Sequence, residues 1–178
     1  AQAMLDQLIE EKWLEARAVV GLFPANAEGD DILIYADESR TEPVATLYNL
    51  RKQGRQPPGK WNECLADWVA PVETGLNDYI GGFACTAGAG IDAHVARFEA
   101  DHDDYSALML KALADRLAEA LAEMLHQQVR TRYWGYAEEE DLANEDLIEE
   151  RYQGIRPAIG YPSSPDPTEK DTLWRLLE

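Results

Sequence analysis

Apolar residues recur along the chain at two spacings, which predicts helices and strands in the same molecule. Spacing of three to four residues is clearest within 101–133, and it predicts one long helix there. The stripe that carries this prediction consists of Leu113, Leu117, Leu121, Met124 and Leu125. The same spacing, together with helix start signals, predicts shorter helices over 2–15, 91–100 and 144–152 and from Thr168 onwards.

Runs of β-forming residues that end at turn residues predict strands. Two such runs lie within 18–36 with turn residues between them, which predicts a β-hairpin. Further strands are expected at 44–50 and 79–86, with a short edge strand at 65–69. We therefore predict an α+β fold, a mostly antiparallel sheet with helices packed on it and one long central helix.

Composition limits the classes of function that remain. The chain has 178 residues and a formal net charge of −18, a field that repels nucleic acid and anionic lipid. No apolar run reaches the roughly 18 residues that a membrane helix needs. Two cysteines suit a reducing cytoplasm. Because the sequence starts without Met and stops within a predicted helix, we expect a single domain over 1–178, cut at both ends.

No motif for nucleophilic catalysis or for phosphate binding is present, so no catalytic residue is predicted. His94 and His102 with Asp101 could suggest a metal, but their spacing places them on different helix faces. An acidic metal-dependent hydrolase is therefore a poor interpretation. The acidic run 137–150 lacks the pattern of a calcium loop and is interpreted as a solvated loop.

The segment 154–162 combines prolines with residues that suit a small ligand. Pro157 and Pro162 exclude a helix, so the peptide groups are expected to face outwards. Arg156 offers a planar fork for a carboxylate, Gly160 lets a ligand approach the main chain, and Tyr161 adds a ring that favours a cation. An amino-acid-like ligand and a plain proline-rich linker both fit this pattern.

The same segment resembles the S-adenosylmethionine-binding motif of a known family, the C-terminal activation domain of cobalamin-dependent methionine synthase. The motif is Gly-Ile-Arg-Pro-Ala-Ile-Gly-Tyr-Pro over 154–162, followed by Pro165-Asp166 and Thr168-Glu169-Lys170. Other blocks are similar to that domain in the same order, namely 19–26, 29–31, 78–83 and 98–136. The resemblance favours the ligand-binding interpretation over the linker.

The resemblance implies a role in reactivating cobalamin within a methyltransferase of methionine biosynthesis. In that family the domain positions S-adenosylmethionine for reductive methylation of cob(II)alamin, while flavodoxin or a diflavin reductase supplies an electron. Cobalamin is held mainly by another domain of the enzyme, so the fragment alone is expected to be only a binding module. The alternative is a free-standing reactivation protein of the same fold that serves a separate corrinoid methyltransferase.

The resemblance also assigns roles to individual residues. It implies that Arg156 holds the methionine carboxylate and that Ala158 and Gly160 meet the ligand through the main chain. Tyr161 is expected to face the sulfonium. Glu119 and Glu150 match acids that lie near the site and could orient Arg156.

One loop departs from the acidic background of the chain. Residues 51–60 carry four cations and no acid, namely Arg51, Lys52, Arg55 and Lys60. Flavodoxins are acidic, so a chain with a net charge of −18 repels them at long range. This basic loop is therefore the candidate docking surface for flavodoxin or the reductase.

Overall fold

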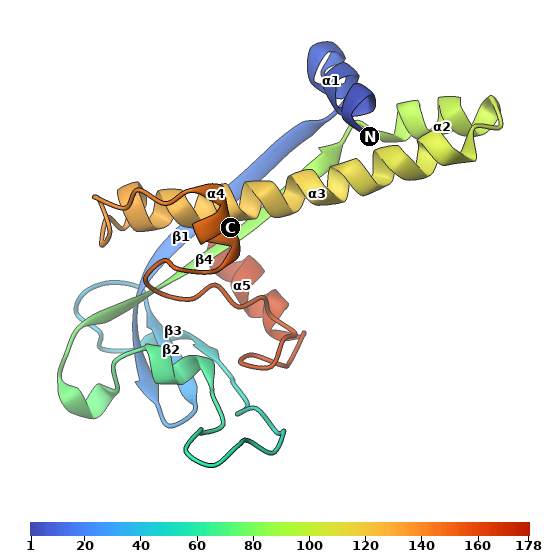
Figure 1. Ribbon diagram of the computed structural model, residues 1–178. Helices are drawn as coiled ribbons and strands as arrows, with labels where there is room; N and C mark the ends of the chain where they lie inside the picture. The colour runs from blue at the N-terminus through green and yellow to red at the C-terminus, as the bar shows by residue number, and fades with distance from the viewer. The chain divides into compact units, whose positions relative to one another are not determined.

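The computed structural model describes residues 1–178 and has the predicted α+β composition (Figure 1). Four strands form one sheet in the order β3-β2-β1-β4. Their bounds are Glu15–Glu28 for β1, Asp31–Tyr35 for β2, Pro43–Leu47 for β3 and Asp78–Ala89 for β4. The chain divides into two compact units, of which unit 1 is 1–19 with 84–153 and unit 2 is 20–83 with 154–178.

Unit 1 is largely helical and contains the predicted long helix. It holds α1 (Gln2–Glu11), α2 (Asp92–Ala100), α3 (Asp104–Gln128) and the short α4 (Asn144–Ile148). A π-helical turn, Val129–Tyr133, continues α3. Asp103 caps α3 by accepting a hydrogen bond from the N–H of Ser106. The core of the unit consists of Leu8, Trp13, Val95, Ala107 and Leu110.

Unit 2 contains the predicted hairpin and the C-terminal helix α5 (Glu169–Leu177). The strands β1 and β2 are antiparallel and paired up to Glu28 and Asp31, so the connecting turn is short. Gly29 adopts a positive φ of 62° in that turn, a conformation that glycine takes without strain. Alternating residues of the hairpin, including Ala25, Ala27, Ile32 and Ile34, are buried in the core of this unit.

Three predicted elements differ in the structure. The helix expected over 2–15 already ends at Glu11, and Glu15 begins β1. Residues 65–69 are not an edge strand, because Leu65–Trp68 forms a 3-10 helix. The carboxylate of Asp67 accepts the N–H of Cys64, and this local bond closes the turn instead of leaving the backbone to pair with a strand. The helix expected over 144–152 already ends at Ile148, and Glu150 has a left-handed φ of 53°.

None of the helices combines the length and the apolar character that a bilayer crossing requires.

Candidate functional site

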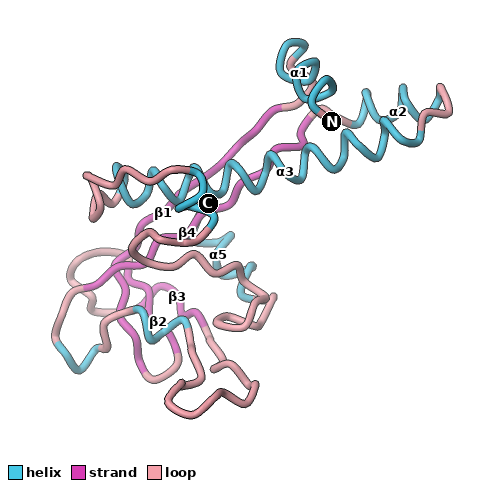
Figure 2. Tube along the Cα trace, in the orientation of Figure 1, coloured by secondary structure: helices cyan, strands magenta, loops and turns pink.

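The ligand segment predicted from the sequence is not helical, as expected. Between α4 and α5, residues 155–158 have no regular structure, and a tight turn follows (Figure 2). Gly154 and Gly160 bracket the stretch with positive φ angles of 95° and 101°. Arg156 in its middle is partly buried, while Ala158 and Tyr161 are exposed. The segment thus presents the main chain at Ala158 and the ring of Tyr161 at the surface of unit 2.

The second half of the segment uses its own peptide groups, which corrects the expectation that the whole strip offers them outwards. The N–H of Gly160 donates to the carbonyl of Ser164 at 2.8 Å, and the N–H of Ser164 donates back to Tyr161 at 2.9 Å. The N–H of Tyr161 donates to the carbonyl of Ala158 at 3.2 Å. The prolines exclude a helix here, and a turn satisfies these peptide N–H and carbonyl groups instead. Outward-facing peptide groups are therefore confined to the stretch around Ala158.

Position 160 requires glycine because of its backbone conformation, rather than because a ligand needs the space of a side chain. Its φ of 101° lies in the region that side chains rarely adopt. A methyl group built there would approach Pro167 only to 3.9 Å, which is ordinary contact. The glycine therefore fixes the turn that carries Tyr161, whose side chain is 65% exposed.

The turn is attached to the 3-10 helix of unit 2. The N–H of Leu65 donates to the carbonyl of Ser163 at 3.0 Å, and Ser164 is buried. Segments a hundred residues apart in the sequence are thus held together beside Tyr161. This connection explains why Leu65 does not pair as a strand.

The two acids that the resemblance places near Arg156 belong to unit 1, whereas Arg156 belongs to unit 2. Glu119 is exposed on α3 and accepts a hydrogen bond from Arg116 at 2.8 Å. Glu150 is exposed, and its N–H donates to the carbonyl of Leu147 at 3.1 Å. Their role in orienting Arg156 stays a prediction.

The basic loop 51–60 is irregular, but one of its four cations is already occupied. Arg51 donates both terminal nitrogens to Asp67, at 2.7 and 2.8 Å, and its Nε lies 2.8 Å from Asp30. The guanidinium holds the pKa of Asp67 below its ordinary value, and Asp67 likewise raises the pKa of Arg51. Arg51 therefore stabilises the loop, which leaves Lys52, Arg55 and Lys60 as candidate docking cations.

The residues considered for metal binding are used otherwise. His94 stacks on the indole of Trp13 with 4.5 Å between ring centroids. His102 lies in the turn before α3 with a left-handed φ of 58°. No group of three His, Cys, Asp or Glu side chains is arranged to hold a metal ion.

One residue of the acidic run 137–150 is not solvated, which corrects that expectation. The side chain of Glu140 is only 6% exposed and forms two hydrogen bonds of 2.7 Å with Arg130, which is fully buried. The guanidinium also lies over the ring of Tyr152, 4.0 Å from its centroid. Sequence patterns contain little signal for this group, because an arginine near a helix end is ordinarily solvated.

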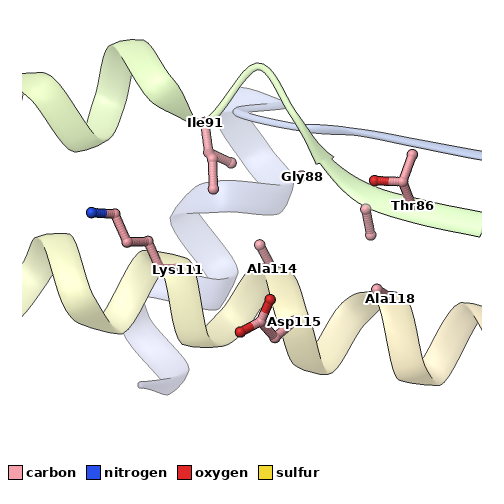
Figure 3. Close-up of a pocket in the computed structure, with 8 residues that line it drawn as sticks. Thr86, Gly88, Ile91, Lys111, Ala114, Asp115 and Ala118 are labelled. Atoms are coloured by element: carbon pink, nitrogen blue, oxygen red, sulfur yellow. The ribbon is translucent and has the colours of Figure 1, made fainter. Parts of the chain in front are cut away.

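Each unit contains a pocket. A pocket of about 210 Å³ in unit 1 lies between β4 and α3, with small residues at its base and Lys111 and Asp115 beside it (Figure 3). A larger one of about 370 Å³ in unit 2 is lined by residues of the hairpin and α5, including Phe23, Tyr35, Thr172 and Arg175. None of the predicted ligand residues lines either pocket.

Comparisons with known proteins agree with the sequence motifs. The family model described as "Vitamin B12 dependent methionine synthase, activation domain" matches residues 1–178. A solved structure, the MetH reactivation domain bound to AdoHcy, is 58% identical and superposes with a TM-score of 0.93. It is matched over 99% of this chain, which spans 54% of the length of that protein chain. The chain therefore belongs to the family of activation domains of vitamin B12-dependent methionine synthase.

Proposed function

We propose that the chain binds S-adenosylmethionine and positions it for the reductive methylation of cob(II)alamin in a cobalamin-dependent methionine synthase. The observation that carries this proposal is the AdoHcy-bound relative, which is 58% identical over 99% of the chain. AdoHcy is S-adenosylmethionine without its transferred methyl group, so both share the amino-acid end and the adenosine. The description of that relative as a MetH domain favours this role over a free-standing reactivation protein.

The residues of segment 154–162 fit such a ligand. The guanidinium of Arg156 suits the methionine carboxylate through two parallel hydrogen bonds. Exposed Ala158 offers its N–H beside it, and the exposed ring of Tyr161 offers a face that attracts the positive sulfonium. We assign the carboxylate to Arg156, the main-chain contact to Ala158 and the sulfonium side to Tyr161.

The chain itself supplies binding and orientation. When bound, S-adenosylmethionine supplies the methyl group for the reduced cobalt. Arg156 and Tyr161 would hold the two ends of the methionine portion, which fixes the direction in which its methyl group points. We accordingly propose that residues 1–178 act as a binding module, with catalysis belonging to the complete methionine synthase.

Two partners follow from this role. Cobalamin requires the cobalamin-binding domain of the same enzyme, and the electron requires flavodoxin or a diflavin reductase. For the acidic electron donor we propose the basic loop as the docking surface, through the exposed Arg55 and Lys60 and the half-buried Lys52.

Replacement of Arg156 tests the proposed function. In the full-length protein, Arg156→Ala is expected to weaken AdoHcy binding by about 1.5–3 kcal/mol, or roughly tenfold to 150-fold in Kd, because a charge-assisted hydrogen bond is lost. Isothermal titration calorimetry measures this change. Arg151→Ala is the matched control, because it removes an exposed cation that lies five residues before Arg156 and pairs with Asp146 and Glu149. Equal affinities for Arg156→Ala and the unaltered protein would refute the assignment.

A further inference from the structure

Two exposed tryptophans lie beside the basic loop of unit 2. Trp61 follows Lys60 directly and is 72% exposed, and Trp68 is 57% exposed at the end of the 3-10 helix Leu65–Trp68. Single exposed apolar residues are common on protein surfaces, but aromatic residues and arginine are enriched where proteins bind one another. Exposed indoles next to a cationic loop are therefore typical of a surface that binds another protein.

The two ends of the basic loop are held together by hydrogen bonds. The N–H of Lys52 donates to the carbonyl of Glu63 at 2.9 Å, and the side-chain amide of Asn62 donates back to the carbonyl of Lys52. A terminal nitrogen of Arg51 also donates to the carbonyl of Asn62 at 3.0 Å. The loop therefore leaves unit 2 and returns to it at one fixed place (Figure 1).

A turn inside the loop sets the direction in which Trp61 leaves it. The N–H of Lys60 donates to the carbonyl of Pro57 at 3.1 Å, with Pro58 and Gly59 between them. Gly59 has a φ of 86°, which after a proline is the pattern of a type II turn. The proline and the hydrogen bond limit the conformations of the loop, so Trp61 follows a turn of defined shape.

Arg51 connects the two tryptophans through their neighbours in the sequence. Its guanidinium holds the carbonyl of Asn62, which follows Trp61, and the carboxylate of Asp67, which precedes Trp68. The main chain next to both indoles is thus attached to one side chain, while the tryptophans themselves stay exposed. A surface whose main chain is already fixed loses less conformational entropy when it binds a partner.

The charge around the indoles favours an acidic partner. The three remaining cations of the basic loop outnumber the exposed acid that follows it, Glu63, since Asp67 is paired with Arg51. The chain as a whole carries a net charge of −18, so the sign of the charge is reversed locally. A protein surface with an apolar spot among carboxylates would match both the indoles and the cations.

We infer that Trp61 and Trp68 form the apolar centre of the docking surface for the acidic electron donor, and that the cations of the basic loop form its rim. This inference rests on the proposed function for the identity of the partner, and it adds the residues that retain the partner after encounter. Rim charges mainly raise the rate of association, whereas a buried aromatic anchor mainly lowers the rate of dissociation. The two parts of the surface therefore have different kinetic signatures.

Replacement of Trp61 tests the anchor. With the full-length protein and purified flavodoxin, Trp61→Ala is expected to raise the dissociation rate roughly 30-fold, as for an interface hot spot, and to leave the association rate and its salt dependence unchanged. Trp174→Ala is the matched control, because it removes a tryptophan that is 55% exposed on α5, outside the loop. Surface plasmon resonance at several salt concentrations measures both rates.

A second position and a conservative variant complete the test. Trp68→Ala is expected to raise the dissociation rate about fivefold, because Trp68 is the less exposed of the two indoles. Trp61→Phe keeps an aromatic ring and should recover most of the affinity that Trp61→Ala loses. Since both positions are exposed, all variants should have the Tm of the unaltered protein. An unchanged dissociation rate in one alanine variant removes that residue from the surface. Unchanged rates in both, or an equal increase in Trp174→Ala, overturn the inference.

The outcomes separate this inference from the proposed function. If the unaltered protein does not bind flavodoxin, the proposed partner fails and the anchor fails with it. If it binds, and reversal of the loop cations slows association while Trp61→Ala and Trp68→Ala dissociate at the parental rate, only the anchor is refuted. If these two variants dissociate faster and reversal of the cations has no effect, the charged rim is refuted.

Discussion

Arg51 and Arg130 are the same residue type, yet the fold uses their charges differently. Arg51 joins Asp30 and Asp67 at the partly exposed base of a loop, whereas Arg130 is buried with Glu140. In both cases the cation fixes a neighbouring irregular segment. Neither is available to a partner protein in the way that the sequence suggested for Arg51.

The ion pair of Arg51 predicts how stability depends on pH. Because the folded pKa of Asp67 is lowered, its contribution to stability is complete above the unfolded pKa of about 4 and is lost as pH falls through the folded value. Asp67→Asn should lack this contribution, so the two proteins should converge in stability below about pH 4. Urea unfolding at a series of pH values measures this. In contrast, the stability of Asp141→Asn, a change in the exposed loop, should depend on pH as that of the parent protein does. A difference in unfolding free energy between Asp67→Asn and the parent that stays constant with pH would contradict the prediction.

At this scale, the sequence indicates candidate residues whose proposed roles follow from their type. Arg156, Gly160 and Tyr161 could be singled out because a fork, a positive φ and a ring are properties of the residues themselves. Glu140 and Tyr152 could not, because their importance comes from Arg130, which meets them ten and 22 residues further along the chain. Local patterning contains no signal for such a pairing.

Among the elements, the strand β4 depends on close contact with α5 within unit 2. A methyl group built on Gly82 would lie 2.5 Å from Cδ1 of Leu173, which is too close. Gly88 on the same strand has no atom within 4 Å of such a group. The two glycines therefore have different surroundings although both lie within β4.

This difference predicts opposite effects of the same substitution. Gly82→Ala should lower the free energy of unfolding by about 1 kcal/mol, because Leu173 must leave its rotamer. Gly88→Ala should leave stability unchanged or raise it slightly, since alanine orders the unfolded chain more than glycine does. Thermal or urea denaturation distinguishes them. Combining Gly82→Ala with Leu173→Ala should recover part of the loss, and equal losses in both glycine variants would show that crowding is not the cause.

Elements with a long, regular pattern could be predicted from the sequence, whereas those set by one local bond could not. The stripe of leucines predicted α3, and alternation with turn residues predicted the hairpin. The 3-10 helix Leu65–Trp68 depends on the Asp67 carboxylate and on the Ser163 carbonyl. The second of these lies about a hundred residues away, so no window of sequence contains it.

At the scale of the whole molecule, charge determines which partners can approach. The net charge of −18 opposes an acidic electron donor at long range, and the loop 51–60 is the local exception. With Arg51 paired, the remaining cations there are the half-buried Lys52 and the exposed Arg55 and Lys60. The division into two units, by contrast, has no signal in the composition of the sequence, because two of its three boundaries fall inside β1 and β4.

Charge reversal tests the docking surface. Replacing Lys52, Arg55 and Lys60 by Glu should raise the Kd for flavodoxin roughly tenfold at low salt and flatten its dependence on ionic strength. Reversal of Arg17, Lys111 and Arg132, three cations of unit 1, changes the net charge equally and is the control. Titrations at several salt concentrations compare the two. A similar effect from both triple variants would mean that only total charge matters and that the loop is not a docking surface.

The π-helical turn has a consequence for how relatives of this chain can diverge. An α-helix advances each residue by about 100°, so the additional residue of a π turn redirects everything that follows by that amount. Shortening Val129–Tyr133 by one residue would restore a uniform helix and turn Arg130 or its aromatic neighbours towards solvent. Insertions and deletions should therefore be rare between Leu125 and Tyr136 and more common in the exposed loop beyond Glu140.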